Sequence, residues 1–465
     1  MSGGKQNASR TSTATRIAVI AAFVVLLGVP VALRPEKPET PEGARVPEDA
    51  EPLVIISPHS QSIRREFERA FSEWLATNHG RSARIEWTDV GGTMQAIAYV
   101  ADQFQQTPSG IGIDLFFGGG VDPFLHLKPK GFLHRCSIPA EVLDRIPQTY
   151  AGMEIYDADH YWFGACLAGF GLFYNKKVLD FLDLPEPQTW QDLGRPRYYT
   201  WISSGDPRLS GSMHMVYEII LQAYGWEEGW ATVMRIGANC RRFTRQASEV
   251  QWEVSAGEAA CGMAIDTYAL PAVARVGSDR MGFRLPDGLT VVNPDGIGVL
   301  KGAPHVETAE LFVEFVLSEA GQKLWILKPG TPGGPHVYAL HRLPVIPGLV
   351  RKYSETSAVS LNPFEFEGGV DFDPEKKNVR WRILNDLFGA RIIDTHSELS
   401  RAWRRLRHLP EDHPDRRRLL RPPISEREML ELAGQRWNDP YFRAETVSRW
   451  SAEARELYRT LAEGQ

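Results

Sequence analysis

Short apolar segments alternate with amphipathic ones along most of this chain, and this alternation limits the folds that it can adopt. Residues 53–56 form a β-branched apolar run, and apolar residues then recur at helical spacing from Ile63 to Leu75. Gly80 stands where such a helix should stop, and a second strand-like run begins at Arg84. A strand, a helix and a strand in succession predict a βαβ unit with a parallel sheet, so the expected fold class is α/β.

The strand–helix pattern starts afresh after Trp162, which indicates a second lobe. With 465 residues, 43% of them hydrophobic, the chain can bury more than one core. We expect lobe one to comprise residues 53–161 and 267–349 and lobe two to comprise residues 162–266, each with its own sheet and with a cleft between them. Residues 350–465 are predicted to form a helical extension that packs largely on lobe two.

The amino terminus has the features of a targeting segment. Basic residues precede an uncharged apolar run over residues 17–33, as in a secretory signal. This run is close to the ~20 residues of a membrane span, so residues 1–33 are predicted to be a signal peptide or an uncleaved signal-anchor. Residues 34–52 are rich in Pro and Glu and are expected to be a linker. Either alternative places the body outside the cytoplasm, in the periplasm or an equivalent compartment.

Composition excludes several classes of function. A net charge of −6 with 24% charged residues provides no general basic surface, so no nucleic-acid partner is expected. The sequence has no phosphate-loop or dinucleotide motif and its four cysteines match no zinc pattern, so no cofactor is predicted. An Arg-rich stretch over residues 401–421 alternates with acidic residues, which favours a solvated helix face over a basic patch for an anionic partner.

The sequence suggests one disulfide, between Cys240 and Cys261. Each precedes a predicted strand, and a single predicted helix lies between the two strands. Consecutive strands joined by one helix are commonly adjacent, and adjacent strands are about 4.8 Å apart, within the usual range for a disulfide. We therefore expect a bond between these cysteines, with two buried free thiols as the alternative.

Ligand-contacting residues are expected where strands end, because open α/β sheets bind ligands outside the carboxyl ends of their strands. The candidate ligand-binding residues at such places are His59, Ser60, Gly92, Thr93, Gly119, Gly120, Ser210, Gly211, Ser212, Asp266 and Tyr268. The Ser-Gly-Ser segment at 210–212 is the sharpest signal among them. Its hydroxyls, its backbone N–H groups at a helix start and its glycine favour an anion site, with a serine helix cap that holds no ligand as the alternative.

Between residues 160 and 270 the order and spacing of several motifs carry a family resemblance. The motifs are Tyr161-Trp162-Phe163-Gly164, Gly169-Phe170-Gly171-Leu172-Phe173-Tyr174-Asn175, Pro187-Gln188-Thr189-Trp190, Asp206-Pro207-Arg208-Leu209-Ser210-Gly211-Ser212 and Gly257-Glu258-Ala259-Ala260-Cys261-Gly262-Met263-Ala264-Ile265-Asp266-Thr267-Tyr268. This stretch resembles the second lobe of the extracellular solute-binding proteins of ABC importers, which have the type II periplasmic-binding fold. The likeness extends from about residue 53 to about residue 349.

The resemblance implies a monomeric binding protein that captures a small molecule or an ion between two lobes. It would pass this solute, expected to be anionic or metal-complexed, to an ABC permease in the membrane without catalysing a reaction. A membrane-anchored ligand sensor and a secreted enzyme on the same fold are the alternatives. His59, Asp266 and Ser210 can be drawn as a triad, but the sequence has no nucleophile-elbow or metalloprotease motif.

Within that family the chain is most similar to the group that binds ferric ion, phosphonates, thiamine, polyamines and sugar phosphates. Ferric members place a His after the first strand and two consecutive tyrosines later; His59 matches the His and Tyr268 the first tyrosine, so both are candidate metal ligands. Ala269 replaces the second tyrosine, which weakens the case for iron because Fe(III) needs several anionic oxygen ligands. Stacking on an organic ligand is the alternative role for Tyr268, and helix capping is the alternative for Asp266.

Overall fold

A computed structural model of the protein describes residues 50–150, 152–365 and 369–464. The predicted targeting segment, residues 1–33, and residues 34–49 of the predicted linker lie outside the described residues. Among the helices of the described ranges, none combines the length and the apolar character needed to cross a bilayer.

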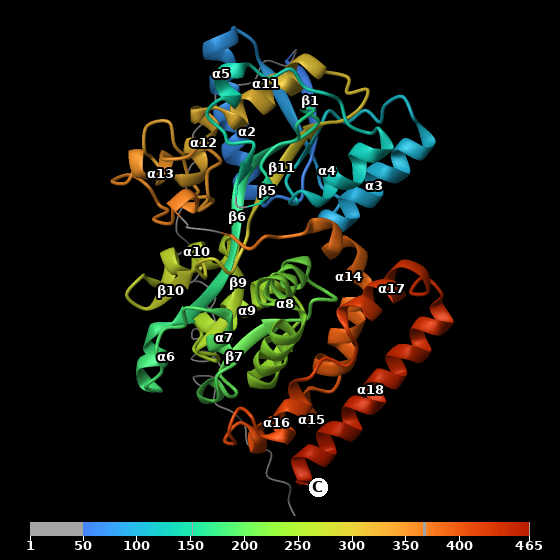
Figure 1. Ribbon diagram of the computed structural model, residues 1–465. Coiled ribbons are helices and arrows are strands. Elements are labelled where there is room, and N and C mark those ends of the chain that lie inside the picture. Colours follow the sequence, from blue (N-terminus) through green and yellow to red (C-terminus); the bar gives the residue numbers. More distant parts are fainter. Residues whose placement is uncertain (1–49, 151, 366–368, 465) are drawn as a thin grey trace, which may run out of the picture. The chain divides into compact units, whose positions relative to one another are not determined.

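Within the described residues, nine strands form one mixed sheet, which confirms the predicted α/β class (Figure 1). Its order is β2 (Ala83–Thr88), β1 (Glu51–Ile56), β3 (Leu115–Phe117), β11 (Val292–Val299), β6 (Phe163–Asn175), β9 (Cys261–Ile265), β7 (Ile202–Gly205) and β8 (Cys240–Thr244), with β10 (Met281–Arg284) also paired to β6. Strand β1 is parallel to both of its neighbours, and so is β7. Strands β6 and β11 run antiparallel to theirs.

Strand β6 joins the two halves of this sheet. Its residues 163–169 pair with β11, and its residues 170–174 pair with β9. Hydrogen bonding therefore continues from one half to the other, and the expectation of a separate sheet in each lobe is wrong. The physical reason is the length of β6, whose 13 residues are all buried and reach across both halves.

The core nevertheless divides into two main parts, and β6 contributes to both. Phe163, Ala165 and Leu167 pack into the core around β1, β3 and α2 (Gln61–His79), α11 (Val306–Leu317) and α12 (Glu319–Ile326). Phe170 and Leu172 pack into the core around β7, β9 and α8 (Gly211–Asn239). We call these two parts, with the elements packed on them, lobe I and lobe II.

Helix α2 shows how the local sequence directs lobe I. Its buried positions Ile63, Phe67, Phe71 and Leu75 recur every four residues, as predicted, and face the strands and α12. The helix ends at Gly80, whose φ of 62° is a conformation that glycine adopts without strain. The following strand β2 pairs in parallel with β1, which confirms the predicted βαβ unit.

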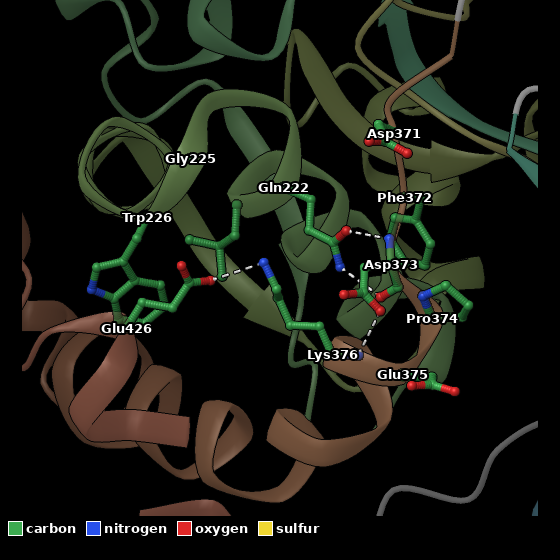
Figure 2. A pocket seen from close by; sticks show the side chains of 11 residues that line it. Gln222, Gly225, Trp226, Asp371, Phe372, Asp373, Pro374, Glu375, Lys376 and Glu426 are labelled. Atoms are coloured by element: carbon green, nitrogen blue, oxygen red, sulfur yellow. Dashed lines mark hydrogen bonds and ion pairs between the residues drawn. The ribbon is translucent and has the colours of Figure 1, made fainter. Parts of the chain in front are cut away.

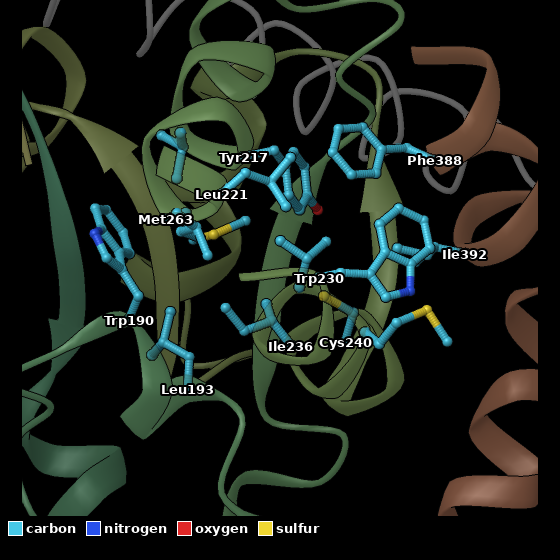
Figure 3. Packing of buried hydrophobic residues seen from close by; sticks show 14 of the residues in the cluster. Trp190, Leu193, Tyr217, Leu221, Trp230, Ile236, Cys240, Met263, Phe388 and Ile392 are labelled. Carbon is cyan, nitrogen blue, oxygen red and sulfur yellow. The ribbon is translucent and has the colours of Figure 1, made fainter. Parts of the chain in front are cut away.

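Lobe II is built on a helix that is longer than predicted. The sequence predicts a helix over residues 212–224, but α8 runs to Asn239 through a kink at Gly225, where φ is 75° and ψ is 170°. Glycine permits this conformation, so one long element continues through the break. Beyond the kink, Trp230 returns to the core that Figure 3 shows, together with Tyr217 and Leu221.

The carboxyl-terminal residues form helices that share the core of lobe II. They are α14 (Pro374–Phe388), α15 (His396–Leu406), α16 (Pro414–Leu420), α17 (Glu426–Gln435) and α18 (Pro440–Glu463). Phe388 of α14 packs against Tyr217 at 4.9 Å and against Trp230 at 6.0 Å between ring centroids (Figure 3). Within this region Arg405 pairs with Asp415, so part of the Arg-rich stretch is neutralised locally.

The predicted disulfide is wrong, because the two strands that carry the cysteines are not adjacent. Strand β7 lies between them, and its Ile202 is the register partner of both Cys240 and Cys261. Two strand spacings amount to about 9.6 Å, which exceeds the Cα separation that a disulfide can span. Both cysteines are buried free thiols, as are Cys136 and Cys166.

Candidate functional site

In lobe I the structure brings together several of the predicted residues at the ends of β1 and β3. Glycines 118, 119 and 120 follow β3 with φ angles of 97°, 87° and 77°. A Cβ atom at Gly118 would lie 2.6 Å from the ring of His59, and one at Gly119 would lie 2.9 Å from Thr93 Cγ2. His59 and Thr93 therefore pack directly on this glycine turn, which only residues without a side chain can form.

His59 is fixed by a carboxylate that the sequence did not single out. Its Nε2 lies 3.0 Å from Asp295 Oδ2, and the backbone N–H of Gly120 donates to Asp295 Oδ1 at 2.7 Å. Burial alone would raise the pKa of Asp295, but the charge and hydrogen bond of His59, with Arg342 and the Gly120 N–H, lower it to about 2. These contacts position His59 and Asp295 beside the glycine turn at the strand ends of lobe I.

Asp266 occupies the junction of the two lobes. It is fully buried at the start of α10 (Asp266–Val276), and its Oδ2 accepts from the N–H of Gly169 at 2.9 Å. Gly169 is the last residue of β6 that pairs with β11, so this bond lies where the strand passes to lobe II. Burial raises the pKa of Asp266 to about 7. Asp266 Oδ1 has no hydrogen-bond partner among the described residues.

Tyr268 and Ala269 follow Asp266 on α10 and differ in exposure. Tyr268 is 41% exposed, whereas Ala269 is fully buried. Among the residues that the structure describes, no group of three or more His, Cys, Asp or Glu side chains is placed to hold a metal ion. Tyr268 thus offers a phenol ring at the surface, and His59 offers an imidazole whose Nε2 is already engaged.

In lobe II the Ser-Gly-Ser segment starts α8, as predicted. Ser210 is the N-cap and its Oγ accepts from the N–H of Met213 at 3.4 Å, so this serine does cap the helix. Gly211 is exposed and Ser212 is half-buried. The remaining N–H groups of the first turn have no partner within the helix, and the positive end of the helix dipole lies there.

Helix α14 of the carboxyl-terminal region lies beside this helix start. Trp381 stacks on His214 with 3.5 Å between ring centroids, and its Cη2 atom lies 3.9 Å from the position that a Cβ atom at Gly211 would take. Asn385 Oδ1 contacts His214 Nδ1 at 2.7 Å. The sequence predicts a helical extension over residues 350–465, but nothing in it indicates that Trp381 would lie beside the start of α8.

The sequence also did not single out three polar residues of lobe I, namely Arg64, Arg342 and Asn293. Arg64 donates to the carbonyl of Ser57 at 2.6 Å and pairs with Asp89 at 3.1 Å, so it spans the ends of β1 and β2. Arg342 is close enough to Asp266 and Asp295 to oppose the effect of burial on the pKa of each. Asn293 Oδ1 is buried without a partner in the described part of the chain. Arg64 and Arg342 thus add cationic side chains to lobe I, and Asn293 adds a polar one.

A separate pocket of about 630 Å³ lies away from the predicted residues, between the kink of α8 and the segment that leads into α14 (Figure 2). Its charged lining residues are Asp371, Asp373, Glu375, Glu426 and Lys376. This lining is mainly acidic and contains none of the residues at the strand ends. This pocket therefore does not suit an anionic solute, and the strand ends remain the candidate site for one.

Comparison with known proteins agrees with this architecture. Residues 111–342 match the family model described as bacterial extracellular solute-binding protein. Over 224 residues the chain is 31% identical to the phosphoglycerate transport regulatory protein PgtC of Salmonella typhimurium, which covers 48% of this chain and 53% of that protein. The chain thus spans about half the length of this curated relative.

Two solved structures share the fold at low identity. The periplasmic binding protein AfuA of Actinobacillus pleuropneumoniae, solved with fructose-6-phosphate, matches with a TM-score of 0.55 and 19% identity over 73% of this chain and 98% of that one. Apo ferric ion-binding protein A of Pasteurella haemolytica matches with a TM-score of 0.50 and 16% identity over 68% and 93%. Residues 111–342 are therefore a bacterial extracellular solute-binding domain, and the fold of the chain agrees with this assignment.

Proposed function

We propose that the protein captures a small, phosphate-bearing anion outside the cytoplasm, between its two lobes, and hands it to an ABC permease. The observation that carries this proposal is the start of α8, where Gly211 is exposed between two serines at the positive end of a long helix. Backbone N–H groups and hydroxyls converging at a helix start suit a phosphate group, which carries about −1.5 to −2 charges at neutral pH.

The comparisons support a phosphate ester in particular. The relative with 31% identity is named for phosphoglycerate transport, and AfuA was solved with a sugar phosphate. On the side of lobe I, Arg342 and the glycine turn with His59 would face the rest of the solute. A site with donors in both lobes gives the ligand contacts that favour closure of the lobes.

Ferric iron is supported less well than a phosphate ester. Ala269 stands where ferric members have a second tyrosine, and it is fully buried. His59 already contacts Asp295 through Nε2. Tyr268 therefore suits stacking on an organic ligand better than coordination of ferric iron.

We extend the proposal to the state of the protein in the cell. It acts as an exported monomer that binds and releases its solute unchanged, with residues 1–33 as its signal peptide or membrane anchor. The family description and the fold are those of solute-binding proteins, which supports binding over catalysis. Mass spectrometry of the protein from membranes and from the periplasm separates a cleaved signal from a retained anchor.

A second candidate is a ligand sensor that reports to a membrane partner other than a permease. One specific observation favours it, because the similar protein PgtC is named a transport regulatory protein. The sensor needs the same solute site, so the two candidates differ only in the partner. Cross-linking of the liganded protein in its own membranes distinguishes them, since a permease partner supports transport and a signalling partner supports the sensor.

Isothermal titration calorimetry with matched solutes tests the proposed function. The panel contains 3-phosphoglycerate with glycerate, fructose-6-phosphate with fructose, and also spermidine and ferric citrate. At least one phosphate ester is expected to bind about a hundredfold more tightly than its unphosphorylated partner, and it should be recovered intact. Binding of only neutral sugars or amines would reject the anion assignment, and consumption of the ligand would establish an enzyme.

A further inference from the structure

Helix α14 is anchored on lobe II by a buried ion pair. Arg380 donates to Glu218 of α8 through Nη2 at 2.6 Å and through Nε at 3.1 Å, and both side chains are almost completely buried. Lys377, Trp381 and Asn385 follow one another at intervals of four residues along α14, so they lie on the same face of the helix. Asn385 and Trp381 both contact His214 of α8. The helix must therefore move with lobe II.

The segment that leads into α14 is fixed to α8 as well. Figure 2 shows the side chain of Gln222 bonded to the backbone of Asp373 in both directions, at 2.7 Å and 3.1 Å. Asp373 then caps α14 by accepting from the N–H of Lys376 at 2.9 Å. The Nζ atom of Lys376 lies 3.6 Å from Oε1 of Glu426, on α17. The first turn of α14 thus has a defined position on lobe II.

Lys377 points from this anchored helix to the other lobe. Its Nζ lies 3.0 Å from Oδ1 of Asp122, the first residue of α4 (Asp122–Leu127), which packs on the strands of lobe I. Lys377 is only 5% exposed, whereas the side chain of Asp122 is half exposed. Asp122 also comes directly after the glycine turn and Val121. The bridge therefore spans from the edge of the proposed site in lobe I to the helix beside the Ser-Gly-Ser segment in lobe II.

We infer that α14 is a strap between the lobes, and that the Lys377–Asp122 ion pair sets the balance between their open and closed arrangements. Any rotation of one lobe against the other changes the distance between these two side chains, because each belongs to a different lobe. Separating them would leave a buried ammonium group without its carboxylate, which is unfavourable. Both Lys377 and α14 lie outside the residues that match the family model, 111–342. The inference goes beyond the proposed function and holds for any solute.

The distance between the lobes in the absence of any solute tests this inference. Spin labels are placed at Asp102→Cys on α3 (Thr93–Gln106) of lobe I and at Asp180→Cys on α6 (Lys176–Phe181) of lobe II, both exposed positions. The four native cysteines are buried, so the labels react at the introduced ones. Double electron–electron resonance then gives the distribution of distances in the full chain, with Lys377→Met or Asp122→Asn added.

Loss of the pair is expected to lower the population of the arrangement that forms it about fivefold or more relative to the other, as in typical coupled equilibria. Each single variant should change the ratio in the same direction, and the double variant should change it no further than the larger of the two. Lys128→Met is the matched control, because Lys128 pairs with Asp157 at 2.5 Å and Asp159 at 3.0 Å within lobe I. It should leave the distances unchanged.

Two outcomes would overturn the strap. One is an unchanged distance distribution in both Lys377→Met and Asp122→Asn; the other is an equal change in Lys128→Met. The Asp122→Asn variant keeps the test valid if Lys377→Met fails to fold, since its side chain is half exposed and nearly isosteric. Because no solute is present, a failure here is independent of the calorimetric test of the proposed function.

Discussion

Two buried carboxyl groups near the junction of the lobes have opposite pKa shifts, and their immediate partners explain the difference. Burial acts to raise both pKa values. For Asp295, the charge and hydrogen bond of His59 overcome burial and lower the pKa to about 2. For Asp266, burial outweighs the charge of Arg342 and the N–H groups of Gly169 and Thr267, and the pKa rises to about 7. The two residues should therefore affect stability in opposite pH ranges.

Asp266→Asn is predicted to stabilise the protein progressively as pH rises from about 4 to about 7. Over this range the unfolded chain loses the Asp266 proton before the folded chain does, so ionisation favours unfolding of the native sequence. A rise in pKa from 3.8 to about 7 corresponds to roughly 4 kcal/mol in the free energy of unfolding. Urea unfolding of the native protein and the variant at pH 5 and pH 8 measures this difference in the free energy of unfolding. A stability difference between variant and native protein that does not change with pH would contradict the assignment.

Asp295→Asn is predicted to destabilise the protein by about 3 kcal/mol at pH 7, because it leaves His59 without its buried carboxylate. The pKa of Asp295 is lowered in the folded state, so its stabilising effect is present above about pH 4 and is lost as pH falls towards 2. The deficit of the variant should accordingly shrink between pH 7 and pH 3 in the same unfolding measurements. A deficit that is constant across this range would show that the ion pair is not its source.

Residues of the candidate site could be proposed from the sequence only where the local sequence carries a signal. His59, the glycine turn and the Ser-Gly-Ser segment each follow or open a recognisable element. Asp295 lies 236 residues from His59 in the chain, and an Asp inside a strand-like run has no local mark. His59 and Asp295 meet because β1 and β11 lie close together in the sheet, and no periodicity in the sequence indicates this arrangement.

At the scale of the element, the turn after β3 depends on two properties of glycine that can be separated. Gly118 and Gly120 both have positive φ angles, 97° and 77°. A Cβ atom at Gly118 would also meet the His59 ring at 2.6 Å, whereas the nearest atom to one at Gly120 is 4.0 Å away. Gly118→Ala should therefore lower the free energy of unfolding by about 3 kcal/mol and Gly120→Ala by only about 1 to 2 kcal/mol. Equal losses in thermal or urea unfolding would show that the contact with His59 is unimportant.

The elements themselves were predicted well where one face is buried and less well where the chain departs from regular geometry. Helix α2 and strands β1 and β2 follow their patterns closely. The helix predicted over residues 212–224 continues beyond Gly225, because Trp226 and Trp230 after the kink pack in the core of lobe II. The disulfide prediction failed because consecutive strands in a chain need not be neighbours in a sheet: β7 precedes both cysteine-bearing strands in sequence and lies between them.

At the scale of the whole molecule, the α/β class follows from the alternation of strands and helices, but the way the two lobes are joined does not. Strand β6 belongs to both cores, and α14 adds a second link through Lys377 and Asp122. The sequence shows an amphipathic helix there and a lysine on it, which is true of many helices. Only the packing of α14 against α8 gives that lysine a partner in the other lobe.

The most direct test of the proposed function is the affinity of a phosphate ester for the variant Ser212→Asp, measured by titration calorimetry. An acidic residue in the first turn favours the helix, so the variant should fold as well as the native chain. Its carboxylate would repel a phosphate about 4 Å away by roughly 4 kcal/mol, so binding should weaken about a hundredfold or more. Tyr441→Asp, at the same position of the distant helix α18 and 87% exposed, should bind normally. A phosphate ester that binds Ser212→Asp as tightly as the native protein would contradict the assignment of the solute site to the start of α8.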